Sequence, residues 1–146
     1  MIARIAPLVF ALLFTGAALA QKPPVYSDSA GAIRGYDPVA YFTEGRPVKG
    51  AKQFTHRWNG AEWRFASDEN RVRFAAAPEK YAPQYGGYCA YGVAGGYAVK
   101  IEPDAWSVVD GKLYLNYDRG VQASWQKDAP GFIRKANANW PGVLER

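Results

Sequence analysis

An Asn-Gly pair between two runs of alternating aromatic and polar residues restricts the fold of this chain more than any other feature. The runs cover residues 53–58 and 61–66, and Asn59-Gly60 separates them. Both positions of a two-residue hairpin turn need a positive φ, which Asn and Gly tolerate. One face of the predicted hairpin then carries Phe54, His56, Trp58, Trp63 and Phe65. The predicted pairs are Trp58 with Ala61, Arg57 with Glu62, His56 with Trp63, Thr55 with Arg64, and Phe54 with Phe65.

A second hairpin is predicted further along the chain. Residues 106–109 and 112–117 alternate in the same way around Asp110-Gly111. The apolar face of this hairpin is expected to carry Trp106, Val108, Leu113 and Leu115.

Helix start and stop signals surround the hairpins. Asp37-Pro38 predicts a short helical turn over residues 39–43, because Asp caps a helix and Pro suits its first position. Ser67 or Asp68 is expected to cap a helix that ends before Pro78. That helix has apolar positions at 72 and 74–77, and Pro78 is expected to start a further turn. Asp118 begins the predicted C-terminal helices, whose apolar residues are Val121, Trp125, Phe132, Ala136 and Trp140.

The composition agrees with one globular domain. The chain has 146 residues, of which 49% are hydrophobic and 21% charged, and this length leaves no room for two large domains. We therefore expect an α+β fold: a small single domain with two antiparallel β-hairpins, helices packed on one side and helices at the C-terminus.

The first twenty residues have the pattern of a secretory signal peptide. Arg4 provides a positive charge, residues 8–19 are uncharged and mostly apolar, and Ala18-Leu19-Ala20 is an A-x-A cleavage pattern. The apolar stretch is shorter than the ~20 residues of a spanning helix, so no stable membrane anchor is expected after cleavage. The sequence predicts a signal peptide at 1–20, a loose lead-in at 21–35 and a domain at 36–146. The mature protein would be periplasmic or secreted.

Charge and rare residues exclude several classes of function. The formal net charge is +5, but the Lys and Arg residues are scattered, so no nucleic-acid partner is expected. One Cys excludes an intrachain disulfide framework and a multi-thiolate metal site within one chain. One His, with no supporting catalytic motif, argues against hydrolytic catalysis and favours a non-enzymatic role.

Several separated motifs together resemble the YHS-domain family. They are Asp37-Pro38-Val39, the hairpin around Asn59-Gly60, Phe74 followed by Pro78-Glu79-Lys80-Tyr81, and Gly86-Gly87-Tyr88-Cys89-Ala90. The chain looks most similar to the exported bacterial branch, in which Leu113-Tyr114-Leu115-Asn116-Tyr117 and Asn139-Trp140-Pro141 also have counterparts. The resemblance runs from about Tyr36 to Trp140.

The resemblance implies a metal knuckle in the shorter members of the family, but this chain lacks its ligands. Cysteines that follow Asp-Pro-Val and the hairpin in those members correspond here to Ala40, Ala66 and Asn70. None of these residues supplies a thiolate. His56 lies near the position of the name-giving His of the family, and Cys89 belongs to the motif of the branch.

Cys89 and His56 each have two interpretations. A small thiol among Gly and Ala is a natural packing residue, whereas a thiol kept in an oxidising compartment could be reactive or bind a metal. A histidine between Phe54 and Trp58 is expected to be a hydrogen-bonded core residue, unless it shares a pocket with Cys89. Together they would offer the N and S ligands that copper(I) or zinc favours, completed by Asp37, Asp104 or a partner chain.

The sequence therefore leaves two classes of function open, with a thiol-dependent enzyme as a distant third. The first is a non-enzymatic metal-handling protein that binds copper or zinc through Cys89 and His56. The second is a metal-free ligand-binding or protein-interaction module in which Cys89 only packs. In either class the expected pocket residues are Tyr85, Tyr88, Tyr91 and Asp37.

Overall fold

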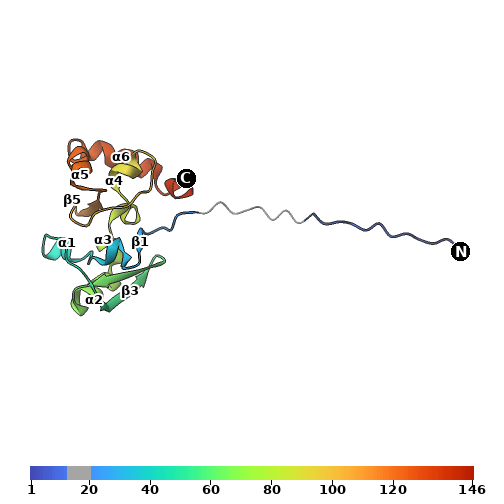
Figure 1. Ribbon diagram of the computed structural model, residues 1–146, viewed down its shortest axis with the longest axis horizontal. Helices are drawn as coiled ribbons and strands as arrows, with labels where there is room; N and C mark the ends of the chain where they lie inside the picture. Colours follow the sequence, from blue (N-terminus) through green and yellow to red (C-terminus); the bar gives the residue numbers. More distant parts are fainter. Residues whose placement is uncertain (13–20) are drawn as a thin grey trace.

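The computed structural model describes residues 1–12 and 21–146 of the chain. Residues 1–12 contain no helix or strand, are exposed and extend away from the rest of the protein (Figure 1). The predicted cleavage pattern and most of the apolar signal stretch fall in residues 13–20, outside the described part. Within the described ranges, no helix is both long and apolar enough to cross a membrane.

The fold is a small α+β domain that contains short helices and antiparallel strand pairs. As predicted, the class is α+β and the chain ends in helices. Among the described residues there are three two-stranded antiparallel sheets, β1-β2, β3-β4 and β5-β6, one more than expected. The elements are β1 (Ser27–Asp28), β2 (Gly31–Ala32), η1 (Ile33–Gly35), α1 (Ala40–Thr43), β3 (Ala51–Trp58), β4 (Ala61–Phe65), α2 (Asp68–Ala76), α3 (Pro78–Tyr81), η2 (Gln84–Gly87), α4 (Ala90–Ala94), β5 (Trp106–Val109), β6 (Lys112–Leu115), α5 (Arg119–Gln126), α6 (Ala129–Asn139) and η3 (Gly142–Glu145).

The first predicted hairpin is confirmed near its turn and wrong at its far end. Asn59 and Gly60 have φ values of 51° and 76°, as the tight turn requires. Four predicted pairs, from Trp58–Ala61 to Thr55–Arg64, are present. Phe65 pairs with Ala51 instead of Phe54, because an irregularity in β3 shifts the register between Ala51 and Thr55.

The buried face of this hairpin lies mainly on β4. Trp63 and Phe65 have no exposed surface, while Phe54, His56 and Trp58 on β3 are half-buried. All five therefore face the interior to some extent, as predicted, but only the β4 residues are fully enclosed.

The predicted caps of α2 and α5 are confirmed. The Ser67 side chain accepts a hydrogen bond from the N–H of Asn70 and so caps α2. Asp118 caps α5 in the same way. The N-cap of α1 is Val39, not the predicted Asp37, and α6 is capped by Asp128, a residue that was not predicted as a cap. Within α2, however, Phe74 is fully buried whereas Val72 is 51% exposed. Only one of these two predicted apolar positions therefore faces the core.

The second hairpin follows its prediction. Asp110 and Gly111 have φ values of 51° and 74°, and Trp106 pairs with Leu115. Leu113 and Leu115 are fully buried, but Val108 on the expected apolar face is 40% exposed.

The segment expected as a loose lead-in lies against the domain from Lys22 onward. The N–H of Lys22 donates to the Leu144 carbonyl, and the N–H of Tyr26 donates to the Gly86 carbonyl. Val25 is buried, and the β1-β2 pair follows it. The residues that make these backbone contacts show no hydrophobic periodicity, so the sequence pattern did not indicate the contacts.

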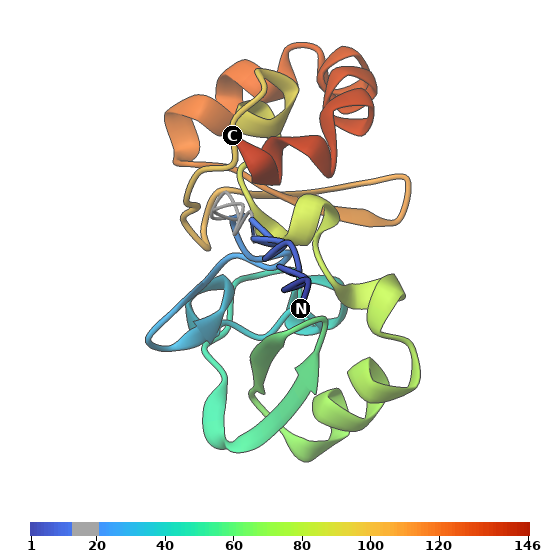
Figure 2. The same ribbon diagram turned by 90° about the vertical axis from the view of Figure 1, so that its right-hand side faces the viewer.

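Two hydrophobic clusters form the core, and Figure 2 shows the corresponding two halves of the molecule. The lower half contains the β3-β4 hairpin, drawn in green, and the upper half contains the C-terminal helices in orange and red (Figure 2). Trp63, Phe65 and Phe74 belong to the first cluster, while Tyr85 and Trp125 belong to the second. η2 and the chain around it lie between these two halves. We call the boundary between the halves the seam.

Candidate functional site

Cys89 caps the short helix α4. Its side chain is 1% exposed. Sγ accepts hydrogen bonds from the N–H groups of Gly92, at 3.4 Å, and Tyr117, at 3.2 Å. The thiol lies 3.5 Å from Oδ1 of Asn116, to which it can donate. These contacts tie the start of α4 to the chain that leaves β6, so the thiol has a defined structural role.

The burial of Cys89 disfavours the thiolate form of its side chain. Burial raises the pKa of the Cys89 thiol above its ordinary value, and the surrounding backbone N–H groups offset part of that increase. Since the thiolate is the nucleophile and the metal ligand, a thiol with a raised pKa is a weak candidate for either role at neutral pH.

We expect Cys89 in the native protein to react with a thiol reagent at neutral pH at least about a hundredfold more slowly than in the denatured chain. Absorbance of the released reporter measures both rates. The matched control is Ser124→Cys in a Cys89→Ser background, because Ser124 is exposed on α5 and its thiol should react quickly. Equal rates for Cys89 and the control would contradict the structural role of this thiol.

Asn116 is a buried polar residue that the sequence reasoning did not select. It has no exposed surface, and its Oδ1 accepts the N–H of Tyr91 at 3.0 Å as well as facing Cys89. Its Nδ2 has no hydrogen-bond partner among the described residues. A signal was present in the sequence, because Asn116 directly follows the buried residues Leu113 to Leu115. A polar residue that stays buried at a strand end needs a specific partner.

His56 lies on a different element from Cys89. Its ring packs edge-on against Phe74, with ring centres 6.2 Å apart, and the residue pairs with Trp63 across the hairpin. Figure 1 shows β3 in the lower half of the molecule and α4 in the upper half. Within residues 1–12 and 21–146, no group of three or more His, Cys, Asp or Glu side chains could hold a metal ion. A joint site of Cys89 and His56 stays a prediction.

The carboxylate of Asp37 is the centre of a buried hydrogen-bond cluster. Asp37 has no exposed surface. Oδ1 accepts the N–H groups of Val39, at 2.8 Å, and Ala40, at 3.3 Å. Oδ2 accepts the N–H of Ala66, at 2.9 Å, and Nδ2 of Asn70, at 2.8 Å. One side chain therefore joins the start of α1 to the junction of β4 and α2.

The three positions that correspond to the knuckle cysteines of the shorter family members meet at this carboxylate, and none of them supplies a thiolate. Ala40 and Ala66 carry no donor atom in their side chains, and each instead donates its backbone N–H to Asp37. Asn70 turns its amide nitrogen toward Asp37. With all four bonds directed at its oxygens, Asp37 acts as a structural link in this position.

Tyr88 and Tyr91, which were predicted to line a pocket, have other contacts. Tyr88 is buried, and its hydroxyl donates to the Pro23 carbonyl at 2.8 Å. Tyr91 is 39% exposed and packs on Phe132, with ring centres 5.0 Å apart. Asp104, a further candidate, is exposed and pairs with Arg119 at 3.1 Å.

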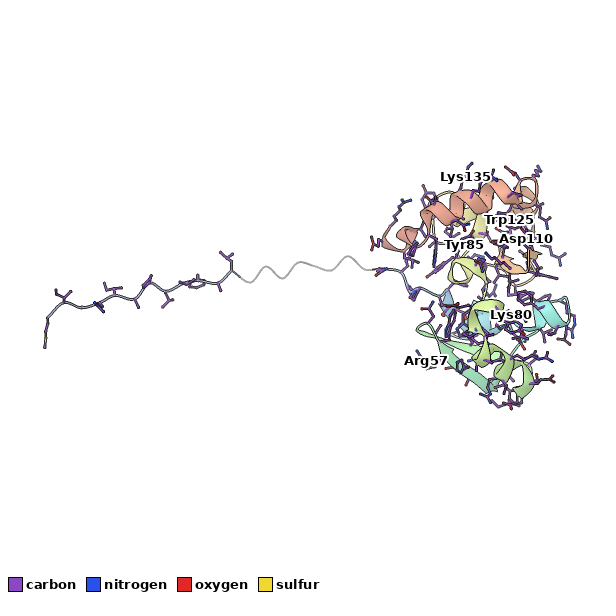
Figure 3. The ribbon with its side chains drawn as sticks, turned by 180° about the vertical axis from the view of Figure 1, so that it is seen from behind. Arg57, Lys80, Tyr85, Asp110, Trp125 and Lys135 are labelled. Carbon is purple, nitrogen blue, oxygen red and sulfur yellow. The ribbon has the colours of Figure 1, made fainter. Side chains whose placement is uncertain are left out.

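A groove lies along the seam between the two halves. Its cavity has a volume of about 210 Å³. Tyr85, one of the predicted pocket residues, lines it, and Figure 3 shows Tyr85 between the C-terminal helices and the β3-β4 hairpin. The lining residues are Trp58, Asn59, Trp63, Glu79, Ala82, Pro83, Gln84, Tyr85, Gly86 and Trp140.

Two pairs of aromatic rings line this groove from opposite halves of the molecule. Trp58 and Trp63 form one pair on the hairpin, with ring centres 6.1 Å apart. Tyr85 and Trp140 form the other, also at 6.1 Å. Gly86 between them has a φ of 63°, and a Cβ there would overlap the Pro24 carbonyl, so glycine is required where the lead-in meets the groove.

Comparison with known proteins gives one match. The model of the YHS domain matches residues 39–85, whereas neither the curated proteins nor the solved structures contain a match to this chain. The family is often linked to the handling of metals, copper among them. The match includes His56 and the four hydrogen-bond partners of Asp37, but not Asp37 itself, Cys89, Asn116 or the C-terminal helices. The resemblance of residues 86–140 to an exported bacterial branch stays an interpretation. A match to the YHS domain is thus found at residues 39–85, which is less than half of the chain.

Proposed function

We propose that this chain is a non-enzymatic binding module that holds a small ligand, without a metal, in the groove between the hairpin and the end of α6. The observation that carries the proposal is the pair of aromatic walls, Trp58–Trp63 and Tyr85–Trp140, on opposite sides of one cavity. Binding sites for small molecules are concave, lined mostly by apolar and aromatic groups, and contain few polar residues. Asn59, Glu79 and Gln84 supply those polar groups here.

The environment of Cys89 supports this function over metal handling. The thiol is buried, its pKa is raised and its neighbours are backbone N–H groups and Asn116. Copper or zinc handling by Cys89 and His56 is the competing function, and it requires a deprotonated, accessible thiol and further ligands.

We also propose that the module acts in the periplasm or outside the cell after loss of residues 1–20. The contacts of the lead-in support this boundary: among the described residues 1–12 and 21–146, residues 1–12 are exposed, whereas the N–H of Lys22 donates to the Leu144 carbonyl of the domain. Mass spectrometry of the native protein tests it, with Gln21 as the expected first residue and an intact Met1 as the contrary result.

Nuclear magnetic resonance of the indole N–H groups tests the binding function. The chain has five tryptophans, so the signals can be assigned one by one. Sugars, aromatic acids, organic amines and, separately, copper(I) and zinc are added to the protein. We expect one class of small molecule to shift the signals of Trp58 and Trp140. Trp125 is the internal control, because it is 1% exposed and does not line the groove.

Two variants extend the same test. Trp58→Leu should weaken ligand binding about tenfold, because it removes one ring from the wall. Trp106→Leu is the matched control: Trp106 is also half-buried, but it packs on Tyr41 and does not line the groove. Binding of metal ions alone, or of no small molecule at all, would show the proposed function to be wrong.

A further inference from the structure

If the groove binds a small ligand, as proposed, the chemical class of that ligand depends on which atoms the aromatic rings expose to the groove. The indole N–H of Trp63 donates to the Trp58 carbonyl at 3.1 Å. The hydroxyl of Tyr85 donates to Oδ1 of Asn137 at 2.9 Å. Trp63 has no exposed surface, so its ring supports Trp58 from behind rather than contacting a ligand. The hydroxyl of Tyr85 is already bonded within the protein, so its ring offers a ligand only carbon. The walls therefore suit a group that contacts ring carbon rather than one that needs several hydrogen bonds.

The charge of the groove comes from Glu79. It is the one charged residue among those that line the cavity, and it is exposed at the start of α3. Within the described part of the chain, no Lys or Arg forms an ion pair with it. The neighbouring Lys80 ammonium lies 5.2 Å from the ring centre of Tyr81. A negative charge next to aromatic walls is notable in a chain whose net charge is +5.

Aromatic faces and a carboxylate together attract cations. The face of an aromatic ring is electrostatically negative, and Trp attracts a cation more strongly than Tyr or Phe does. Methylated ammonium groups suit such a site best, because their methyl groups contact the rings and their weak hydration makes desolvation easy. The volume of about 210 Å³ suits a small headgroup, below the ~300–1,000 Å³ of pockets for larger ligands.

The geometry points to a small organic cation of the quaternary or methylated ammonium class as the ligand of this groove. Its charge would lie between the half-buried rings of Trp58 and Trp140, with Glu79 as the counter-ion. Charge complementarity selects this class over anions, and the bonded hydroxyl of Tyr85 selects it over sugars.

Titration of the full protein with choline and with tetramethylammonium, followed by tryptophan fluorescence, tests this inference. We expect saturable binding of both cations. The neutral isostere 3,3-dimethylbutan-1-ol has a carbon in place of the charged nitrogen and should bind at least about fivefold more weakly than choline. Glucose should not bind.

Two variants separate a role of Glu79 from a general effect of charge. Glu79→Gln should weaken choline binding about fivefold, because it removes the counter-ion of a partly solvated site. Glu44→Gln is the matched control, since Glu44 is exposed after α1 and does not line the groove. Both variants lie on the surface, so neither should prevent folding.

The outcomes distinguish the inference from the proposed function. Equal binding of choline and its neutral isostere, or binding of glucose instead of choline, would show the cation inference to be wrong while the groove remains a binding site. Unchanged choline affinity in Glu79→Gln would also contradict it. Failure of the cations to bind, together with no shift of the Trp58 and Trp140 signals by any sugar, aromatic acid or amine, would contradict both.

Discussion

Replacement of Asp37 by alanine is expected to lower the free energy of unfolding by about 4 kcal/mol, and this is the largest effect of any polar substitution proposed for this chain. The carboxylate is fully buried and accepts four hydrogen bonds. Alanine would leave three backbone N–H groups, those of Val39, Ala40 and Ala66, and the amide of Asn70 without this acceptor. Each buried unsatisfied group costs about 1–3 kcal/mol, reduced where the backbone relaxes toward water.

Urea unfolding of the variant and the wild type measures the effect. Two milder variants keep the test decisive if Asp37→Ala does not fold. Asn70→Ala removes one donor and should cost about 1–2 kcal/mol. Asp37→Asn should cost more than Asn70→Ala, because an amide nitrogen would then face the N–H of Ala66. A loss below about 1 kcal/mol for Asp37→Ala would mean that the cluster does not hold α1 to the β4–α2 junction.

Local signals in the sequence predicted most of the secondary structure. Asn59-Gly60 and Asp110-Gly111 place both turns, because few residues adopt two successive positive φ values. Ser67 and Asp118 cap helices through bonds to residues three positions ahead, so their signal is also local. Such features depend on neighbouring residues and can be read from a short stretch of chain.

Features that depend on distant contacts could not be predicted. The register shift in β3 coincides with a close approach at Gly50, where a Cβ would overlap the backbone of Arg64. Hydrogen bonds of Lys22 with Leu144 and of Tyr26 with Gly86 hold the lead-in against the domain. The two residues of each pair are far apart in the sequence. Hydrophobic periodicity along the sequence does not indicate contacts of this kind.

The candidate site also combines features that the sequence indicates with features that only distant contacts create. The sequence selected Cys89 and Asp37 as rare or well-placed chemical groups, but their roles follow from Asn116, Tyr117 and Asn70, which only the fold brings to them. The groove combines residues from the hairpin, α3, η2 and the end of α6. Its aromatic residues were visible in the composition, but their arrangement into two walls was not.

Replacement of Phe74 by alanine is expected to cost about 3–5 kcal/mol of unfolding free energy, because it removes a fully buried ring and leaves a cavity. The Phe74 ring lies 5.1 Å from Trp63, 5.1 Å from Phe65 and 5.8 Å from Trp58, measured between ring centres. It therefore supports the two tryptophans that form one wall of the groove. Loss of this support should weaken ligand binding as well as stability.

Val72→Ala on the same helix is the matched control for this prediction. Val72 is 51% exposed, so its truncation should change stability by no more than about 0.5 kcal/mol. Phe74→Leu keeps most of the volume and should fall between the two. Urea unfolding measures stability, and fluorescence titration of the folded fraction measures ligand affinity. If Phe74→Ala destabilised the protein but left ligand affinity unchanged, the wall formed by Trp58 and Trp63 would not depend on α2, and the groove would be held by β4 and the C-terminal half alone.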